Sequence, residues 1–252
     1  MSVLRSRDNP RVKRWARLAR DAGFRKKERS TLVEGSHLLE EALAAGLRPL
    51  AVLASESAVE RAEIRKLATV VLSDSVFRLI ADAETPQGLA AEVAIPEARK
   101  VEDGPVVFLE GVQDPSNVGA IVRSAAAFGV AEVILDRACA DPLSPKALRA
   151  GMGGHFRVCV NPVLSLQESL DQFNGSIICT LARGGRLLRD VKLSGRLGWV
   201  FGAEGRGVSE ALASRADLRV TIPMREGVES LNVAASAAVC LYEAFSRSAA
   251  GS

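Results

Sequence analysis

The sequence predicts an α/β protein of two domains, the first over residues 1–95 and the second over residues 105–248. A chain of 252 residues exceeds the usual size of one domain, and its 48% apolar content suffices for two cores. Short apolar runs typical of buried strands alternate with helical patterns along both parts. Residues 96–104 between them are charged, begin with proline and show no periodicity, which indicates a linker.

The first domain is expected to begin with an amphipathic helix. Asn9 followed by Pro10 is typical of a helix start, and apolar residues then recur at helical spacing from Val12 onward. The alternation of helices and buried strands predicts a small α/β domain. The expected elements are helices over 10–20 and 36–45 and strands over 50–53, 69–72 and 89–95.

The second domain is expected to hold a mainly parallel sheet with helices on both faces, because its apolar runs alternate with helical stretches. A long final helix rich in small residues is expected over 231–247, and small side chains there suit a crowded core or a subunit contact. The strands are expected over 106–109, 132–135, 157–160, 177–181, 198–201 and 218–222.

Positive charge is concentrated at the start of the chain. Residues 1–30 hold eleven Lys or Arg and three Asp or Glu, an excess of +8; because the whole chain carries +3, the rest carries −5. Such a segment attracts a polyanion by neutralising phosphates and releasing counterions. A solvated helix face or a disordered basic tail is the alternative. The candidate RNA contacts are Arg11, Lys13, Arg14, Arg17 and Arg20.

Several classes of function lose support from composition. No apolar stretch is long enough to span a membrane, and the N-terminus is Arg-rich, so a cytoplasmic protein is expected. The four cysteines and two histidines are scattered without metal-ligand spacing, so no metal site or disulfide framework is expected. Neither a Rossmann glycine motif after the first strand of the second domain nor a phosphate loop occurs.

Three polar or glycine-rich segments follow apparent strands, where open α/β sheets usually build their ligand sites. The first, 109–123, holds Asn117 and Arg123; Asn117 could instead be a helix cap and Arg123 a surface cation. The second, 201–207, has three glycines around Glu204, which permit unusual backbone angles or merely a tight turn. The third, 222–234, enters the final helix, and Ser230 could serve only as its N-cap.

Together these segments closely resemble the SpoU family of RNA ribose methyltransferases, also called the TrmH family, within the SPOUT superfamily. The phrases that carry the resemblance are DPSNVGAIVRSAAAFG, GWVFGAEGRGVS and IPMREGVESLNVAASAAV, in the order of the family's three motifs, with SPKALRAGMGGHFR between the first two. NPRVKRWARL and LVEGSHLLEEAL resemble, more loosely, the family's N-terminal RNA-binding domain, which is similar to ribosomal protein L30e.

The resemblance implies an S-adenosylmethionine-dependent RNA 2′-O-methyltransferase with a trefoil-knot catalytic domain. It implies a homodimer in which the motif-one arginine of one subunit approaches the cofactor of the other, and it implies no metal. The implied catalytic residues are Arg123, Asn117, Glu204, Ser230 and Asn232. The implied cofactor contacts are Gly202, Ile222 and Leu231, with Thr180 and Met224 as further candidates.

The implied chemistry leaves two roles open for Arg123. A ribose hydroxyl is a poor nucleophile until its proton is removed or its oxyanion is stabilised. The family assigns that role to the arginine matching Arg123. Because the pKa of arginine lies above about 12, a clamp on the adjacent phosphate that stabilises developing charge is the alternative to a base.

The RNA target and two other classes of protein stay open at this stage. Ribosomal RNA is expected, with transfer RNA or a ribosomal site of antibiotic resistance as alternatives. The basic helix favours a structured RNA, because shape and phosphate contacts dominate such recognition. A noncatalytic RNA-binding protein would not need the full set of polar motif residues, and a small-molecule-binding protein would leave the basic segment unexplained.

Overall fold

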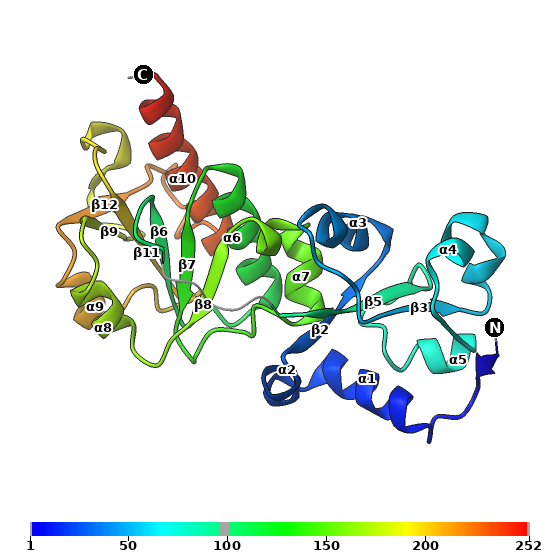
Figure 1. Cartoon of the computed structure of the whole chain (residues 1–252). Coiled ribbons are helices and arrows are strands. Elements are labelled where there is room, and N and C mark those ends of the chain that lie inside the picture. Colours follow the sequence, from blue (N-terminus) through cyan, green and yellow to red (C-terminus); the bar gives the residue numbers. More distant parts are fainter. Residues whose placement is uncertain (1, 96–100, 251–252) are drawn as a thin grey trace. The chain divides into compact units, whose positions relative to one another are not determined.

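The computed structural model describes residues 2–95 and 101–250, without the side chains of residues 249 and 250. By their contacts the residues form an N-terminal unit, Met1–Glu97 with Asp141–Phe156, and a C-terminal unit, Ala98–Ala140 with Arg157–Ser252 (Figure 1). Of the expected linker, residues 96–100 lie outside the described residues. The expected α/β class is confirmed in both units.

The N-terminal unit is built on a five-stranded mixed sheet in the order β1-β4-β3-β5-β2. β1, β4 and β3 run parallel, whereas β5 pairs antiparallel with both β3 and β2. The elements of this unit are β1 (Val3–Leu4), α1 (Pro10–Arg20), α2 (Ala22–Glu28), β2 (Ser30–Glu34), α3 (Ser36–Ala44), β3 (Ala51–Ser55), α4 (Ala62–Leu67), β4 (Val70–Leu72), α5 (Asp74–Phe77), β5 (Leu89–Ala94) and α7 (Pro145–Gly151).

Alternate strand residues of this sheet enter two cores, as the two-residue period of a strand requires. On β3, Leu53 packs in the core with Trp15 of α1, whereas Val52 packs in the core with Leu39 of α3. The first turn of α1 is closed by Asn9, whose side-chain oxygen accepts a hydrogen bond from the Arg11 amide at 2.9 Å. The expected helix over 10–20 therefore forms with its apolar side buried.

Residues 141–156 pack in the N-terminal unit, although the sequence boundaries placed them in the second domain. Leu148 of α7 is buried in the same core as Leu39. Asp141 accepts hydrogen bonds from the buried Arg25 guanidinium, and the Thr31 hydroxyl donates to the Leu143 carbonyl at 2.8 Å. These contacts are made with residues more than a hundred positions away, so local sequence patterns gave no sign of them.

The C-terminal unit is built on a seven-stranded sheet in which every pairing is parallel, in the order β10-β12-β9-β11-β6-β7-β8 (Figure 1). Its elements are β6 (Val106–Glu110), α6 (Pro115–Ala127), β7 (Glu132–Leu135), β8 (Cys159–Pro162), α8 (Leu166–Asp171), β9 (Ser176–Thr180), β10 (Arg186–Leu187), β11 (Leu197–Gly202), α9 (Glu210–Ala213), β12 (Leu218–Thr221) and α10 (Val233–Ala250).

Helices cover both faces of this sheet, as expected. Val107 of β6 faces the core that holds Ile121 of α6 and Ala237 of α10. Phe108 next to it faces the opposite core, with Leu170 of α8. The carboxyl ends of β6, β9, β11 and β12 all meet at one edge of the sheet because their pairings are parallel, which is the edge where such sheets place ligands.

One missed strand and two shifted boundaries are the differences from the sequence prediction that have a clear local cause. The strand β2 was not predicted, because Ser30, Thr31 and Glu34 interrupt its apolar character, yet all five of its residues are buried. The strand expected over 157–160 lies at Cys159–Pro162. The final helix begins at Val233 and not at 231, because the Asn232 side chain caps it through the amides of Ala234 and Ala235.

Candidate active site

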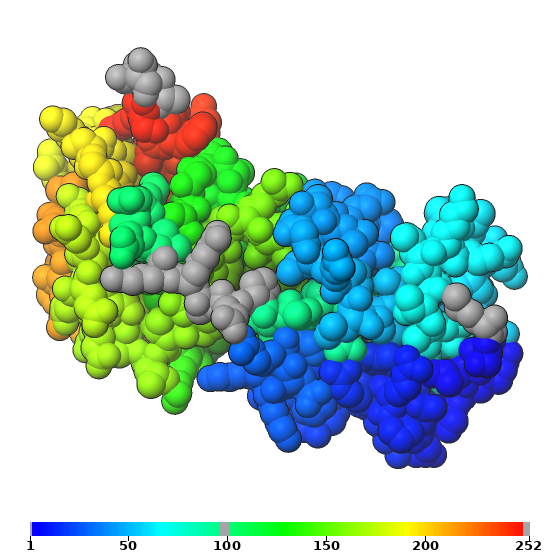
Figure 2. Space-filling view, in the orientation of Figure 1, coloured from blue at the N-terminus to red at the C-terminus, as the bar shows by residue number. Residues whose placement is uncertain are grey.

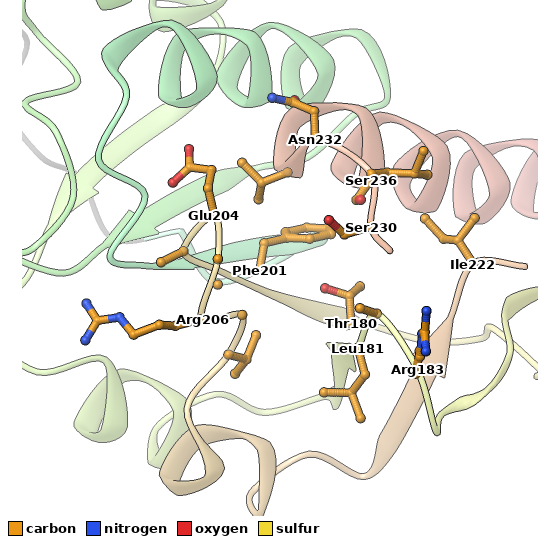
Figure 3. A pocket seen from close by; sticks show the side chains of 18 of the residues that line it. Thr180, Leu181, Arg183, Phe201, Glu204, Arg206, Ile222, Ser230, Asn232 and Ser236 are labelled. Carbon is orange, nitrogen blue, oxygen red and sulfur yellow. The ribbon is translucent and has the colours of Figure 1, made fainter. Parts of the chain in front are cut away.

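A pocket of about 590 Å³ lies at the carboxyl ends of β9, β11 and β12 (Figure 3). Three chain segments build it: the loop after β9, the glycine-rich loop after β11 and the loop from β12 into α10. Its lining residues are Thr180, Leu181, Ala182, Arg183, Phe201, Gly202, Ala203, Glu204, Gly205, Arg206, Gly207, Val208, Ile222, Met224, Ser230, Leu231, Asn232, Val233 and Ser236.

The loop after β11 folds back tightly on itself. The Gly207 amide donates to the Ala203 carbonyl at 2.8 Å, and a Cβ on Gly202 would overlap the backbone of Gly207 and Val208. Gly205 and Gly207 have φ values of 109° and 68°, which side chains disfavour. The glycines are therefore required by the turn itself, and the turn presents its backbone to the pocket.

The β12–α10 loop supplies the opposite wall with Ile222, Met224, Ser230 and Leu231. Ser230 is exposed and is not the N-cap of α10, since Asn232 fills that position. The capping alternative for Ser230 is therefore wrong. Its hydroxyl lies at the pocket wall, as Figure 3 shows.

A chain of hydrogen bonds joins the polar residues of all three expected motifs. The Asn117 side-chain amide donates to Glu204 Oε1 at 2.5 Å, and the Asn232 amide donates to Asn117 Oδ1 at 3.1 Å. Asn117 does not cap α6, because Asp114 does so through the Ser116 amide at 2.9 Å. The structure thus brings together three candidate residues that are up to 115 positions apart.

Arg123 stands apart from this network. It is exposed on α6, two turns after the helix start, and it does not line the pocket of its own chain. Within the residues that the structure describes, its guanidinium has no ion-pair or hydrogen-bond partner. The side chain is therefore available to a group outside the chain.

The candidate RNA contacts on α1 differ in the contacts that their side chains make within the chain. Arg14 donates to both carboxylate oxygens of the buried Glu92 at 2.8 Å and also pairs with Glu28. Lys13 pairs with Asp8, Arg17 pairs with Asp21, and Arg11 lies over the Trp15 ring. Arg20 is exposed.

The Arg14 pair is a structural contact. Burial raises the pKa of Glu92, but the hydrogen bonds from Arg14 and the Trp15 indole hold that pKa below its usual value on balance. Arg14 was expected on the basic face of the helix, and its head group turns from there toward Glu92 of the inner strand β5.

Comparison with known proteins decides the family. Residues 104–242 match the SpoU rRNA Methylase family, and residues 9–91 match the MRM3-like substrate binding domain. The chain belongs to the SpoU rRNA methylase family. The match spans all three loops of the pocket and the Asn117 network.

Relatives resemble this SpoU family member over nearly the full chain. The 23S rRNA (guanosine(2553)-2′-O)-methyltransferase RlmP of Bacillus subtilis is 32% identical over 249 residues, which cover 96% of this chain and 98% of the relative. An RNA 2′-O ribose methyltransferase of known structure shares 28% identity with a TM-score of 0.83, covering 98% of this chain and all of the other.

A further structure was solved with its cofactor. The SpoU methyltransferase AviRb of Streptomyces viridochromogenes, in complex with AdoMet, has a TM-score of 0.84 and 25% identity, with 97% of this chain and all of AviRb covered. S-adenosylmethionine is thus the cofactor to test against the pocket of this SpoU protein.

The pocket residues fit this cofactor. All five expected contacts, Gly202, Ile222, Leu231, Thr180 and Met224, line the pocket. Its volume of about 590 Å³ lies in the usual range for small-molecule sites. Apolar walls from Ile222 and Leu231 suit an adenosine ring.

Sequence reasoning missed several lining residues of this SpoU pocket, among them Phe201, Arg183, Arg206 and Ser236. Phe201 looked like an ordinary strand residue, and it is in fact buried and stacked on Trp199. Arg206 lies inside the predicted glycine-rich loop, so its position could have been inferred. Arg183 follows a predicted strand and precedes two glycines, the one local sign of its place.

The cysteines and histidines show no catalytic arrangement. Burial raises the pKa of Cys139 and Cys240 to about 12 and that of Cys179 to about 11, so these thiols stay protonated at neutral pH. Among residues 2–95 and 101–250, no group of three or more His, Cys, Asp or Glu is placed to hold a metal ion. Over the same residues, no helix has the length and apolar character that a membrane crossing requires.

Proposed function

We propose that this protein transfers the methyl group of S-adenosylmethionine to a ribose 2′-hydroxyl of ribosomal RNA. The observation that carries the proposal is the hydrogen-bonded chain Glu204–Asn117–Asn232 at a pocket lined by all five expected cofactor residues. A binding module would have no need to align three motifs from distant parts of the sequence in this way. Family membership and the AdoMet-bound relative support the same activity.

The residues of the chain act mainly by positioning. Bound S-adenosylmethionine supplies an electrophilic methyl group, and the attacking oxygen must lie in line behind it, so alignment contributes much of the rate. Glu204 and Asn232 fix the orientation of the Asn117 amide from two sides. Arg123 then either accepts the hydroxyl proton or clamps the adjacent phosphate and stabilises the developing charge.

The RNA class follows from the relatives. RlmP of Bacillus subtilis carries a 23S rRNA guanosine 2′-O-methyltransferase name, and a relative in Synechocystis is named a tRNA/rRNA methyltransferase. These names favour ribosomal RNA for this protein, with transfer RNA as the second candidate. The basic N-terminal segment and its match to a substrate binding domain support a structured RNA as the ligand of the N-terminal unit.

The proposal is tested by incubating purified protein with unmodified ribosomal and transfer RNA, separately, and methyl-labelled S-adenosylmethionine, followed by digestion to nucleosides. Label is expected on a ribose 2′-oxygen of ribosomal RNA. Arg123→Ala should lower the rate by about 100-fold or more, the usual loss when a group that stabilises developing charge is removed. Arg215→Ala, an exposed arginine paired with Asp171, should keep the wild-type rate. Label on a base would refute the assigned chemistry.

We propose further that the active form is a homodimer in which Arg123 serves the pocket of the partner subunit. Arg123 is exposed, has no partner among the described residues and does not line its own pocket. The same unit exposes Val239, Tyr242 and Phe245 on α10, and the half-buried Phe128 on the turn after α6 packs against both aromatic rings. An exposed apolar patch that holds aromatic rings is typical of a protein contact.

The dimer is tested by sedimentation of the full chain across a range of concentrations. The double change Tyr242→Glu and Phe245→Glu should shift the protein to monomers and remove methyl transfer, because two charges would be buried at the contact. Leu164→Glu, at an apolar residue that is 72% exposed, is the matched control and should leave the mass unchanged. A wild-type monomer with full activity would contradict the dimer.

Three finer expectations belong to the same proposal. We propose a trefoil knot in the C-terminal unit, an L30e-like fold for the N-terminal unit and a cytoplasmic location. Family membership supports the knot, the mixed sheet order and the substrate-binding match support the L30e-like fold, and the ribosomal RNA substrate supports the location. The proposed chemistry needs no metal.

A further inference from the structure

Arg183 is a cation held at the pocket wall by a short anchored loop. On one side of it, the Leu181 amide donates to the Val220 carbonyl at 2.8 Å. On the other side, the Gly185 amide donates to Thr221 Oγ1 at 2.9 Å, and a Cβ on Gly185 would come within 2.6 Å of the Val220 carbonyl carbon. The backbone around Arg183 is therefore fixed against the end of β12, next to Ile222.

None of the expected cofactor contacts carries a positive charge that could pair with the carboxylate of the cofactor. The charged lining residues are Arg183, Glu204 and Arg206. The Glu204 carboxylate already accepts from Asn117. Within residues 2–95 and 101–250, neither arginine has a hydrogen-bond or ion-pair partner. S-adenosylmethionine carries an α-carboxylate, and guanidinium groups bind carboxylates with paired, charge-assisted hydrogen bonds.

Of the two arginines, Arg183 is the better placed for that carboxylate. Arg206 lies two residues from Glu204, whose negative charge opposes a second carboxylate nearby. Figure 3 shows Arg206 extending away from the other labelled side chains, whereas Arg183 lies on the side of the pocket where Ile222 and Thr180 are drawn. Ile222 and Thr180 are both among the residues expected to contact the cofactor.

We propose that Arg183 binds the α-carboxylate of S-adenosylmethionine and so selects for ligands that carry the amino-acid portion. This inference rests on the proposed function, because it takes S-adenosylmethionine as the ligand of the pocket. The guanidinium forms an ion pair at the pocket mouth, where the carboxylate keeps part of its hydration. Arg183 acts on cofactor affinity, and the Asn117 network is left to orient the acceptor.

The experiment is calorimetric titration of the full chain with S-adenosylmethionine and with decarboxylated S-adenosylmethionine, which lacks only the carboxylate. Arg183→Ala should weaken S-adenosylmethionine binding about tenfold, as expected for one partly hydrated charge-assisted pair. Its affinity for the decarboxylated compound should change less than about twofold. Arg183→Lys should recover part of the loss, because it keeps the charge but not the paired geometry.

Arg206→Ala is the matched control, since it removes the same charge from the same pocket. It should change the affinities for the two compounds by equal factors. Equal losses for both compounds in Arg183→Ala, unchanged affinities in that variant, or a carboxylate-dependent loss in Arg206→Ala would each overturn the inference. Failure of the wild-type protein to bind S-adenosylmethionine would instead overturn the proposed function and this inference with it.

Discussion

His155 illustrates how a single buried residue makes stability depend on pH. It is only 8% exposed in the N-terminal unit, where the cost of burying a charged ring is large. Burial lowers its pKa from 6.5 to about 4, although the Pro142 carbonyl and the Asp141 carboxylate partly oppose the shift. The imidazole is therefore neutral in the folded protein at any pH above about 4.

This shift predicts a loss of stability on mild acidification. Between pH 6.5 and about 4, the unfolded chain takes up a proton at His155 that the folded chain refuses, so the free energy of unfolding falls as pH falls. The total loss from this residue is about 3 kcal/mol. Urea unfolding at about pH 7.5 and about pH 4.5 measures most of this loss.

A variant comparison isolates the contribution of His155. His155→Gln should show a smaller difference between the two pH values than the wild type, whatever its absolute stability. His37→Gln, on the exposed side of α3, should keep the wild-type difference. Equal differences in all three proteins would contradict the assignment.

At the scale of elements, α1 and α2 divide their positive charges between folding and a surface available for RNA. Arg14 is committed to Glu92 and Glu28, and Arg25 is buried against Asp141. Lys26 and Lys27 on α2 are exposed, as is Arg20 at the end of α1. Figure 2 shows the blue segment that holds these helices at the surface of its unit. The candidate RNA surface therefore extends beyond α1 to α2.

This division predicts opposite effects for two kinds of substitution. Lys26→Gln with Lys27→Gln should weaken RNA binding and reduce the slope of log affinity against log salt by about 1.5, because about two phosphate contacts are lost. The free energy of unfolding should change by less than about 0.5 kcal/mol. Filter binding across a salt series and urea unfolding provide the two measurements.

Arg14→Gln is the comparison variant. It should lower the free energy of unfolding and leave the salt slope of RNA binding almost unchanged. It leaves the carboxylate of Glu92 buried beside Trp15 without its main partner, at a cost of about 2 to 3 kcal/mol after allowance for the partly exposed guanidinium. An Arg14→Gln protein of wild-type stability, or lysine changes that leave the salt slope intact, would refute the division.

At the scale of the whole molecule, the chain enters the N-terminal unit twice. Residues 141–156 leave the C-terminal unit after β7 and return to it at Arg157, before β8. Within the N-terminal unit, Leu148 is 1% exposed, Asp141 pairs with Arg25, and Arg149 pairs with Glu34 and Asp82. The first 95 residues alone therefore lack part of their own core.

A pair of fragments tests this dependence. Residues 2–95 should be less stable, by about 4 kcal/mol or more, than the same residues joined through a flexible linker to 141–156, because Arg25 would stay buried without Asp141 and the site of Leu148 would be vacant. Urea unfolding followed by the fluorescence of Trp15, the one tryptophan in either fragment, measures the difference. Fragments of equal stability would show that α7 contributes nothing to the free energy of unfolding of this unit.

Local sequence patterns were enough to predict the class of the fold and the three loops of the candidate site, whereas the roles of single site residues came from the resemblance to the SpoU family. The strand at 132–135 and the helix at 10–20 lie where they were predicted, because strand and helix periods are local properties. The glycine-rich loop and the segments around Ile222 and Leu231 were identified in the same way, since residues that follow neighbouring parallel strands meet at one edge of a sheet.

The pairing of side chains that are far apart in the sequence could be seen only in the folded protein. Asn117 bonds to Glu204 and Asn232 over 87 and 115 positions, and Arg14 bonds to Glu92 over 78 positions. Local patterns had offered a cap for Asn117 and a place on the basic face of the helix for Arg14. A polar side chain satisfies its hydrogen bonds with whatever packing brings near, so its partner depends on the folded arrangement of the whole unit and not on neighbouring residues.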